Sequence, residues 1–371
     1  MGWEKVFSVL SILVDTATAD NNEVETLSKT LTLPVEAATR LSIDLFVSLG
    51  MSEADAAASA WPLIDAESMG IATHGLIRVP AYAKRLRIGG IDAKGRIAVE
   101  RRAPSMALVD GGNATGTAVA ARALDTALEM AAETGIAYVG CRHSNHCGAL
   151  MPYGLKAAEA GHVFIGGTNA STTMPPWGGT EARIGNNPIC IAAPVAEGAH
   201  FLLDMAMSVA ARGKIRAALA AGAPIPADWA VDDGGRPTTD PAAALAGFLS
   251  PMGGHKGSGM SQAIDILCGA LSGAQFLSGI SSWADDPERP SNVGHFFVLL
   301  DPGRLVGKDA FAEAMTRFRD IIVTTPPADP ARPVMLPGQA EQERRRQAIA
   351  DGLTVPADLM AEIEALAGRK S

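Results

Sequence analysis

The sequence lacks the long apolar runs of a membrane protein and the many cysteines of a secreted, disulfide-bonded one. No stretch approaches the roughly 18 to 20 apolar residues that a membrane-spanning helix needs. Its four cysteines, two of them within one short loop, are unlike a disulfide framework. The apolar run at residues 7–14, FSVLSILV, resembles a signal-peptide core, but its flank MGWEK carries one acid against one base, which argues against export. We therefore expect a soluble, cytoplasmic protein.

An excess of positive charge is also absent. The chain has 31 Lys and Arg against 40 Asp and Glu, which gives a net charge of −9 at neutral pH. Its one basic cluster consists of Arg344, Arg345 and Arg346. Because binding to a phosphate backbone needs a basic surface, this balance excludes nucleic acid as a partner. A small anionic substrate remains compatible, since a few local arginines can hold it.

The glycine fingerprint of a Rossmann dinucleotide site, G-x-G-x-x-G, is missing as well. The nearest stretches are GGNATG at residues 111–116 and MGGHKGSG at residues 252–259. The second leads into a helical pattern, so its backbone N–H groups and Lys256 could hold a phosphate, although a flexible turn explains the same residues equally well. A dinucleotide site in this chain would therefore not be of the usual Rossmann kind.

What the sequence does contain is ordinary globular composition, with 47% hydrophobic and 19% charged residues. A chain of 371 residues is expected to form two domains or one large α/β unit with an elaboration. The apolar patterns predict two helices within residues 31–70, the second opened by Ser52 with Asp55 three positions on, and further helices at residues 116–135 and 260–274. Short apolar runs predict strands at residues 136–141, 162–171, 187–195 and 295–301. A proline-rich connection at residues 325–346 leads into a last helix, and the class is mixed α/β.

The segment CRHSNHC, residues 141–147, concentrates side chains that bind metals. It holds four candidate zinc ligands: Cys141, His143, His146 and Cys147. Structural zinc sites usually split their ligands into two separated pairs, and no second pair occurs elsewhere in the chain. A catalytic zinc needs only three protein ligands and a water, so a zinc-dependent hydrolase remains an alternative. The other interpretation is a turn after a strand that directs His146 into a pocket.

Two further segments place proton carriers and cations together. In THGLIR, His74 and Arg78 are four residues apart, which on a helix would put both side chains on one face, although Gly75 and Pro80 weaken the helix assumption. Histidine exchanges protons near neutral pH, and arginine can hold a carboxylate by two parallel hydrogen bonds. The segment at residues 201–215 places Asp204 at the end of an apolar strand, with Arg212 and Lys214 after it.

Five motifs occur in an order that resembles the type 2 malate/L-lactate dehydrogenase family. They are GIATHGLIRVPAYAKRL, SNHCGAL, PWGGTEARIGNNPICIAAP, DMAMSVAARGK and GGHKGSG, and the resemblance covers roughly residues 30–350. It implies an NAD- or NADP-dependent oxidoreductase that interconverts small, anionic 2-hydroxy and 2-oxo acids, usually as a homodimer. It also implies a family-specific fold, not a Rossmann fold, with a large, mostly antiparallel sheet. Family members act on malate, lactate, sulfolactate, ureidoglycolate, diketogulonate or cyclic imino acids.

The resemblance also implies a role for each matching residue, and none of these roles is metal binding. His74 matches the proton donor and acceptor, Thr73 stands where many members have a charge-relaying serine, and Arg78 matches the carboxylate clamp. Lys214 is expected at the catalytic centre, and as a cation it disfavours cyclic imines, whose reductases have an acid there. The expected substrate contacts also include Asn186, Arg212 and Gly213. The expected cofactor contacts are His146, itself the acid/base in some members, with Cys147, Gly148, Ala149, Leu150, Asp204, Met205, Ala206, His255 and Lys256.

We also expect a division into domains. Residues 1–29 would form an N-terminal extension, residues 30–110 with 290–371 a helical domain for substrate binding and dimerisation, and residues 111–289 the NAD(P)-binding domain. Two alternatives to the dehydrogenase stand at this point, the zinc hydrolase and a catalytically inactive binding protein of the same fold. The choice between NAD and NADP is open, because no acidic residue follows a glycine fingerprint.

Overall fold

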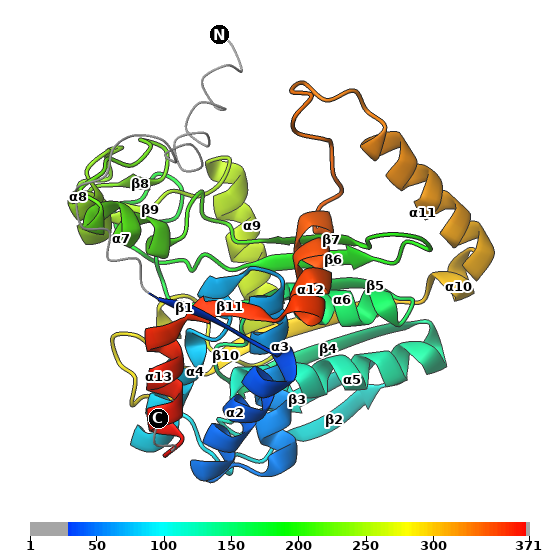
Figure 1. Cartoon of the computed structure of the whole chain (residues 1–371), viewed down its shortest axis with the longest axis horizontal. Coiled ribbons are helices and arrows are strands. Elements are labelled where there is room, and N and C mark those ends of the chain that lie inside the picture. Colours follow the sequence, from blue (N-terminus) through cyan, green and yellow to red (C-terminus); the bar gives the residue numbers. More distant parts are fainter. Residues whose placement is uncertain (1–28, 369–371) are drawn as a thin grey trace.

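A seven-stranded sheet forms the centre of the computed structural model, which describes residues 29–368 (Figure 1). The run at residues 7–14 and the predicted extension up to residue 28 lie outside the described residues. In spatial order the strands are β2 (Ala98–Ala103), β3 (Met106–Asp110), β4 (Ile136–Ser144), β10 (Val293–Leu300), β5 (Val163–Thr168), β6 (Ile189–Ala193) and β7 (Phe201–Met205).

The strand directions confirm the prediction of a mostly antiparallel sheet. Only β3 and β4 run parallel, and every other neighbouring pair is antiparallel. The four strands predicted from short apolar runs correspond to β4, β5, β6 and β10. The division at residues 110 and 290 does not follow the sheet, because β2 and β3 precede residue 111 and β10 lies between β4 and β5. Local patterns carry no information on which strands pair over such a sequence separation.

Two helices cover one face of the sheet. The alanine-rich α5 (Gly116–Thr134) and α6 (Met151–Glu159) pack against strand residues such as Val139, Phe164 and Phe297, which are fully buried. Small side chains let these helices lie close to the strands: a side chain at Gly154 of α6 would meet the Cys190 sulfur of β6 at 2.8 Å. The interior of the molecule is therefore closely packed on this side.

The other face is covered by a unit built from residues 206–280. It contains α7 (Arg212–Ala220), the two-stranded pair of β8 (Ala230–Val231) and β9 (Phe248–Leu249), α8 (Pro241–Ala246) and α9 (His255–Asp265), which continues into a π-helical turn at Ile266–Ala270. The helix predicted at residues 260–274 thus begins five residues earlier, at His255, because Gly253 and Gly254 adopt positive φ angles and turn the chain directly into it.

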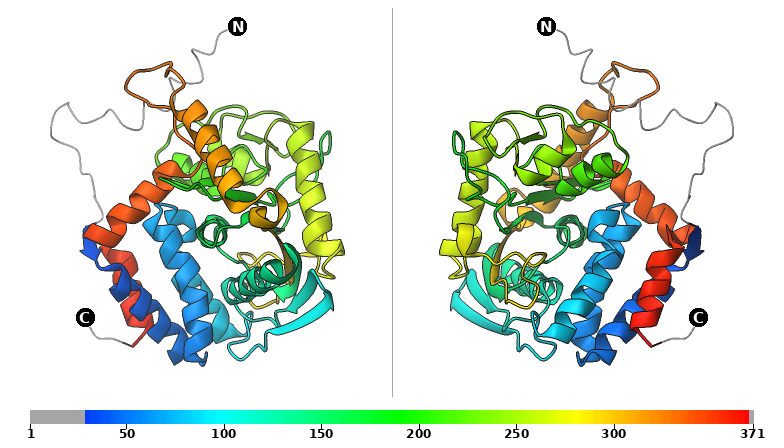
Figure 2. Two further views of the ribbon diagram at one scale, coloured as in Figure 1. Left: turned by 90° about the vertical axis from the view of Figure 1, so that its right-hand side faces the viewer. Right: turned by 90° about the vertical axis from the view of Figure 1, so that its left-hand side faces the viewer.

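A helical layer packs outside α5 and α6. It comprises α2 (Val35–Ser48), α3 (Glu53–Ser68), α4 (Arg78–Ile88), α12 (Gln339–Asp351) and α13 (Ala357–Leu366), with the pair β1 (Thr30–Leu33) and β11 (Leu353–Pro356). The predicted start of α3 is confirmed, since Ser52 accepts a hydrogen bond from the Asp55 N–H. Figure 2 shows this layer and α9 on opposite sides of the molecule.

One long helix was not predicted. After α10 (Pro302–Leu305), α11 (Lys308–Val323) extends away from the sheet, and none of its residues is fully buried (Figure 1). The proline-rich connection then returns to the helical layer, but it is shorter than predicted: α12 begins at Gln339, within the predicted connection, and α13 follows it. No helix among residues 29–368 is long and apolar enough to cross a membrane.

Candidate active site

His74 lies in a short loop that α3 and α4 hold between them. A 3-10 turn at Ala72–His74 is followed by Gly75, and the Leu76 N–H donates to the Glu67 carboxylate of α3 at 2.8 Å. A side chain at Gly75 would lie 2.0 Å from that carboxylate, so only glycine fits there. Thr73 Oγ1 is 2.9 Å from His74 Nδ1, which leaves Nε2 as the other functional atom of the ring. Burial and the nearby Arg78 charge lower the pKa of His74 to about 4, so the ring is neutral at neutral pH.

Arg78 is the first residue of α4, so His74 and Arg78 do not share a helix face. The possibility that both lie on one helix was wrong. Gly75 ends the 3-10 turn that carries His74, and Pro80, which lacks an N–H, is tolerated in α4 because it lies in the first turn of that helix. The two side chains are nevertheless close: Arg78 Nε donates to the Thr73 carbonyl at 2.6 Å, and the Arg78 charge contributes to the lowered pKa of His74. Within residues 29–368 no acid pairs with this guanidinium, and burial together with Arg216 lowers its pKa. Its terminal nitrogens therefore remain available for an anion.

His146 stands in the turn after β4, facing His74. The two rings are stacked with centroids 5.5 Å apart, and Trp283 stacks on His146 at 5.3 Å. The Arg78 guanidinium lies 5.2 Å from the centre of the same indole. Burial and the charges of its neighbours hold the pKa of His146 well below its usual range. Two neutral imidazoles, an indole and an unpaired guanidinium thus share one site.

A buried arginine ties together the segments that carry these groups. Arg85 of α4 donates to the Asn145 amide oxygen, adjacent to His146, at 2.9 Å. It also donates to three backbone carbonyls, those of Gly90, Pro287 and Arg289, the last two in the loop that carries Trp283. Arg85 is 2% exposed, and no acid among the described residues pairs with it. Among the described residues, the hydrogen bonds that stabilise its charge go to neutral amide and carbonyl oxygens.

The turn beyond His146 packs inward. Cys147, Ala149 and Leu150 are buried, and Gly148 adopts a positive φ of 77°. The Asp204 carboxylate accepts hydrogen bonds from the backbone N–H groups of Leu150 and Met151 at 2.9 and 2.8 Å, at the N-terminus of α6. One carboxylate oxygen, Oδ2, thus satisfies two donors that a helix start leaves unpaired. Burial nevertheless raises the pKa of Asp204 to about 6.

A second glycine marks where α5 begins beneath the same turn. A side chain at Gly116 would lie 2.0 Å from the Asn145 carbonyl oxygen, so the start of α5 touches the backbone that carries His146. Below it, the fully buried His295 of β10 connects neighbouring strands: Nε2 is 2.8 Å from Ser144 Oγ and Nδ1 is 2.8 Å from Thr168 Oγ1. Burial lowers the pKa of His295 to about 3.

The predicted phosphate-binding residues lie at the start of α9. His255 and Lys256 are exposed in its first turn, and the exposed Trp177 contacts His255 edge to face at 6.3 Å. The positive-φ turn at Gly253 and Gly254 leads directly into α9, so the exposed Lys256 lies in the first turn of a helix, a position that can hold a phosphate. Met205 and Ala206 are partly buried at the end of β7.

The other predicted substrate residues lie on α7 and in the loop before β6. Arg212 donates to the Leu245 carbonyl at 2.6 Å, and the exposed Lys214 lies 6.0 Å from the centre of the Trp229 ring. Gly213 is exposed and Asn186 partly buried. No hydrogen bond, ion pair or ring contact within residues 29–368 joins these four residues to the histidine pair. The Arg216 charge does act on Arg78, so α7 is near the site.

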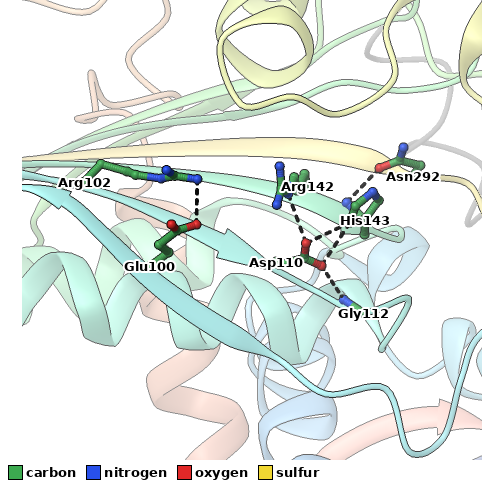
Figure 3. Close-up of polar contacts among 7 residues, drawn as sticks. All are labelled: Glu100, Arg102, Asp110, Gly112, Arg142, His143 and Asn292. Carbon is green, nitrogen blue, oxygen red and sulfur yellow. Dashed lines mark hydrogen bonds and ion pairs between the residues drawn. The ribbon is translucent and has the colours of Figure 1, made fainter.

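The four candidate zinc ligands do not converge. Cys141 points into the core from β4, Cys147 is buried, and burial raises the pKa of Cys147 to about 12, which disfavours the thiolate that zinc requires. His143 adopts a positive φ and faces Asp110, with its ring Nδ1 3.0 Å from the carboxylate. The backbone N–H of His143 donates to the Asn292 side chain (Figure 3). Residues 29–368 hold no group of three metal-binding side chains. The zinc alternative was wrong because the positive φ of His143 turns its side chain to Asp110, away from the buried Cys141 and Cys147.

Four residues of the site were missed by sequence reasoning: Tyr82, Arg85, Trp283 and His295. A signal existed for the first two. Arg78, Tyr82 and Arg85 are spaced by four and three residues, which places three polar side chains on one face of α4. For Trp283 and His295 the sequence offers no signal, because their contacts lie more than 100 residues away.

Known proteins similar to this chain are dehydrogenases of one family. Residues 33–364 match the family model described as malate/L-lactate dehydrogenase. L-sulfolactate dehydrogenase of Methanocaldococcus jannaschii is 34% identical over 88% of this chain and 93% of its own. Ureidoglycolate dehydrogenase (NAD(+)) of Escherichia coli is 34% identical over 84% and 88%. The (2R)-3-sulfolactate dehydrogenase (NADP(+)) of Chromohalobacter salexigens is 32% identical over 88% and 95%.

A solved structure extends the agreement to three dimensions. That of sulfolactate dehydrogenase from Methanocaldococcus jannaschii superposes with a TM-score of 0.86 at 33% identity and covers 92% of this chain and 98% of the other. The predicted family, fold class and cofactor class are thereby confirmed. The chain belongs to the malate/L-lactate dehydrogenase family, NAD(P)-dependent oxidoreductases of 2-hydroxy acids.

Proposed function

We propose that the centre formed by His74, His146 and Arg78 interconverts a small 2-hydroxy acid and its 2-oxo acid. The observation that carries this proposal is an unpaired guanidinium beside two neutral histidines. Arg78 holds the carboxylate through its terminal nitrogens, since Nε is engaged by Thr73. His74 takes the hydroxyl proton in oxidation and returns a proton to the developing alkoxide in reduction, and the Thr73 hydroxyl orients its ring. When bound, the nicotinamide supplies or accepts the hydride.

The cofactor and the remaining substrate contacts are assigned as follows in this proposal. The His146–Leu150 turn and the Asp204–Ala206 segment line the nicotinamide side, with Asp204 acting through the turn whose N–H groups it binds. His255 and Lys256 hold the phosphates. Asn186 and the α7 residues Arg212, Gly213 and Lys214 face the far end of the substrate. Arg216, whose charge acts on Arg78, supports a substrate with a second anionic group, as in malate and sulfolactate.

We also propose a cytoplasmic homodimer. All four cysteines are buried free thiols, which suits a reducing compartment. Large apolar side chains are exposed along α9 and the segment after it: Met260, Ile266, Leu271 and Phe276 are each between 47% and 61% exposed. Large apolar side chains that are exposed in one segment of the chain are typical of an interface between subunits. We assign it to a second copy of the chain.

The test is an absorbance assay of reduced nicotinamide. Purified protein is assayed against a panel of 2-oxo acids with NADH and NADPH in parallel. We expect oxidation of one cofactor with one dianionic acid. His74→Gln should lower kcat about a hundredfold or more, and Arg78→Lys should raise KM about tenfold or more because lysine cannot bind a carboxylate by two parallel bonds.

The matched control is His143→Gln, which changes a histidine outside the centre and should leave both constants within about twofold. The absence of turnover with every acid and both cofactors, or equal losses in the His74 and His143 variants, would refute the proposed centre. Tight cofactor binding without turnover would instead support an inactive binding protein of the same fold.

A further inference from the structure

Tyr82 places a single hydroxyl against two atoms of His146. It lies on α4 one turn after Arg78 and is 2% exposed. Its oxygen is 2.6 Å from the His146 carbonyl oxygen and 2.8 Å from His146 Nδ1. Burial raises the pKa of this phenol far above neutrality, so the group carries its proton throughout the working range.

The single proton of the phenol determines which atom donates in each of these two contacts. A carbonyl oxygen only accepts, so the short contact between two oxygens requires the Tyr82 proton. The phenol has one proton, and the bond to Nδ1 therefore requires a proton on that nitrogen. The Gly148 N–H, which would need Nδ1 as an acceptor, is 3.4 Å away and makes the longer, weaker contact. A neutral imidazole with Nδ1–H has an unprotonated Nε2.

We propose that Tyr82 is a positioning residue that holds neutral His146 as the Nδ1–H tautomer, with Nε2 left as a hydrogen-bond acceptor in the site. The surroundings favour the neutral ring, because Arg78 and Arg85 carry positive charge and no carboxylate is among the groups that act on it. The consequence for catalysis rests on the proposed function. The hydroxyl proton of a 2-hydroxy acid can be shared between Nε2 of His146 and Nε2 of His74, which takes it up in oxidation, whereas the carbonyl of a 2-oxo acid has no proton to share.

The structure offers a matched control for this role. Tyr153 is also fully buried, and its hydroxyl donates to the Cys147 carbonyl at 2.8 Å, one residue further along the same turn. No contact joins its hydroxyl to an imidazole among the described residues. Tyr153→Phe therefore removes an equivalent bond between a tyrosine and a backbone carbonyl, whereas Tyr82→Phe also frees a ring nitrogen.

The first experiment is nitrogen-15 NMR of histidine-labelled protein at neutral pH, with the His146 signals assigned by a His146→Gln variant. We expect a protonated Nδ1 and an unprotonated Nε2 in the wild type, unchanged in Tyr153→Phe and lost or mixed in Tyr82→Phe. Because this reading needs no substrate and no turnover, it distinguishes failure of the tautomer assignment from failure of the proposed reaction. A wild-type protein with Nε2–H would overturn the inference whatever the variants do.

The second experiment separates the two directions of reaction. Tyr82→Phe should raise KM for the 2-hydroxy acid about tenfold, as expected for loss of one well-placed hydrogen bond, with a smaller change for the 2-oxo acid and an unchanged cofactor Kd. Tyr153→Phe should leave the ratio of the KM for the 2-hydroxy acid to the KM for the 2-oxo acid as in the wild type. Equal effects of the two variants on both substrates would reduce Tyr82 to a structural role.

Discussion

Three histidines around the site are kept neutral, and one of them lies inside the sheet. His74 and His146 face the centre, whereas His295 has both ring nitrogens within 2.8 Å of buried hydroxyls. Burial is the main cause of the lowered pKa in each case. Because the pKa of His295, about 3, lies below the usual value near 6.5, the unfolded chain takes up a proton that the folded protein excludes.

This difference makes a prediction about acid stability. The contribution of His295 is fully present above about pH 6.5 and is lost as pH falls towards its folded pKa, by about 2 kcal/mol at about pH 5. His295→Gln keeps polar atoms for Ser144 and Thr168 but does not titrate. We expect the variant to be less stable than wild type near pH 7, by about 1–3 kcal/mol, and this gap to narrow by about 2 kcal/mol near pH 5.

Urea unfolding of both proteins at the two pH values measures the gap. Other groups that titrate in this range cancel in the difference, among them Asp204, whose raised pKa of about 6 has the opposite effect on stability. A gap of the same size at both pH values would contradict a neutral, buried His295.

Among the secondary-structure elements, α4 contributes most to the site. One face of this helix carries Arg78 at the substrate position, Tyr82 on His146, and Arg85 on the loop of Trp283. A helix is rigid over two turns, so the three groups keep fixed spacings. The loop at residues 281–292, in contrast, is held to the helix mainly through Arg85.

We therefore predict that Arg85→Met loosens this loop. The variant leaves the Pro287 and Arg289 carbonyls without their buried donor, which should cost about 2–4 kcal/mol of stability. Amide hydrogen exchange of peptides from residues 281–292 should become faster. The KM for the substrate should also rise, because the contact between the Trp283 ring and Arg78 is lost. The matched control is Arg87→Met on the same helix, whose arginine donates to the Leu366 carbonyl at an exposed position. Equal exchange in the two variants would show that Arg85 does not hold the loop.

At the scale of the whole molecule, the site lies where three distant segments meet: the helical layer with His74 and Arg78, the turn after β4 with His146, and the loop before β10 with Trp283. Helix α9 lies on the far side of the molecule from the helical layer of α2, α12 and α13 (Figure 2). A substitution on α12 can therefore serve as a control for one next to α9.

If α9 forms the dimer interface, Ile266→Glu should convert a dimer into a monomer, because it places a charge at a residue that is 61% exposed in the single chain and buried in the pair. Light scattering coupled to gel filtration gives the mass. Ile349→Glu on α12, at a residue 53% exposed, is the control and should keep the dimer mass. A monomeric wild type, or a dimeric Ile266 variant, would exclude this interface.

Much of the fold was accessible from local pattern. The cap at Ser52, the alanine-rich α5 and four strands of the sheet depend on residues adjacent in sequence, so composition and periodicity reveal them. The α11 helix was missed, and the start of α9 was placed late at the glycines. For the site, His74, Arg78 and His146 were identified and do lie together. The metal interpretation of Cys141 and His143 failed because the positive φ of His143 breaks the regular alternation of β4, so that His143 faces Asp110 while Cys141 lies in the core.

The sequence by itself determined the family, the local elements and the chemical types of the central residues, because each depends on motifs within a few residues of one another. Only the tertiary structure decided which groups meet. In the folded chain, β10 lies between β4 and β5, and Asp204 binds the backbone N–H groups at the start of α6. Trp283 contacts Arg78, and Tyr82 hydrogen-bonds to His146. These contacts join residues 54 to 205 positions apart. Such contacts follow from packing and hydrogen-bond satisfaction across the whole chain rather than from local pattern.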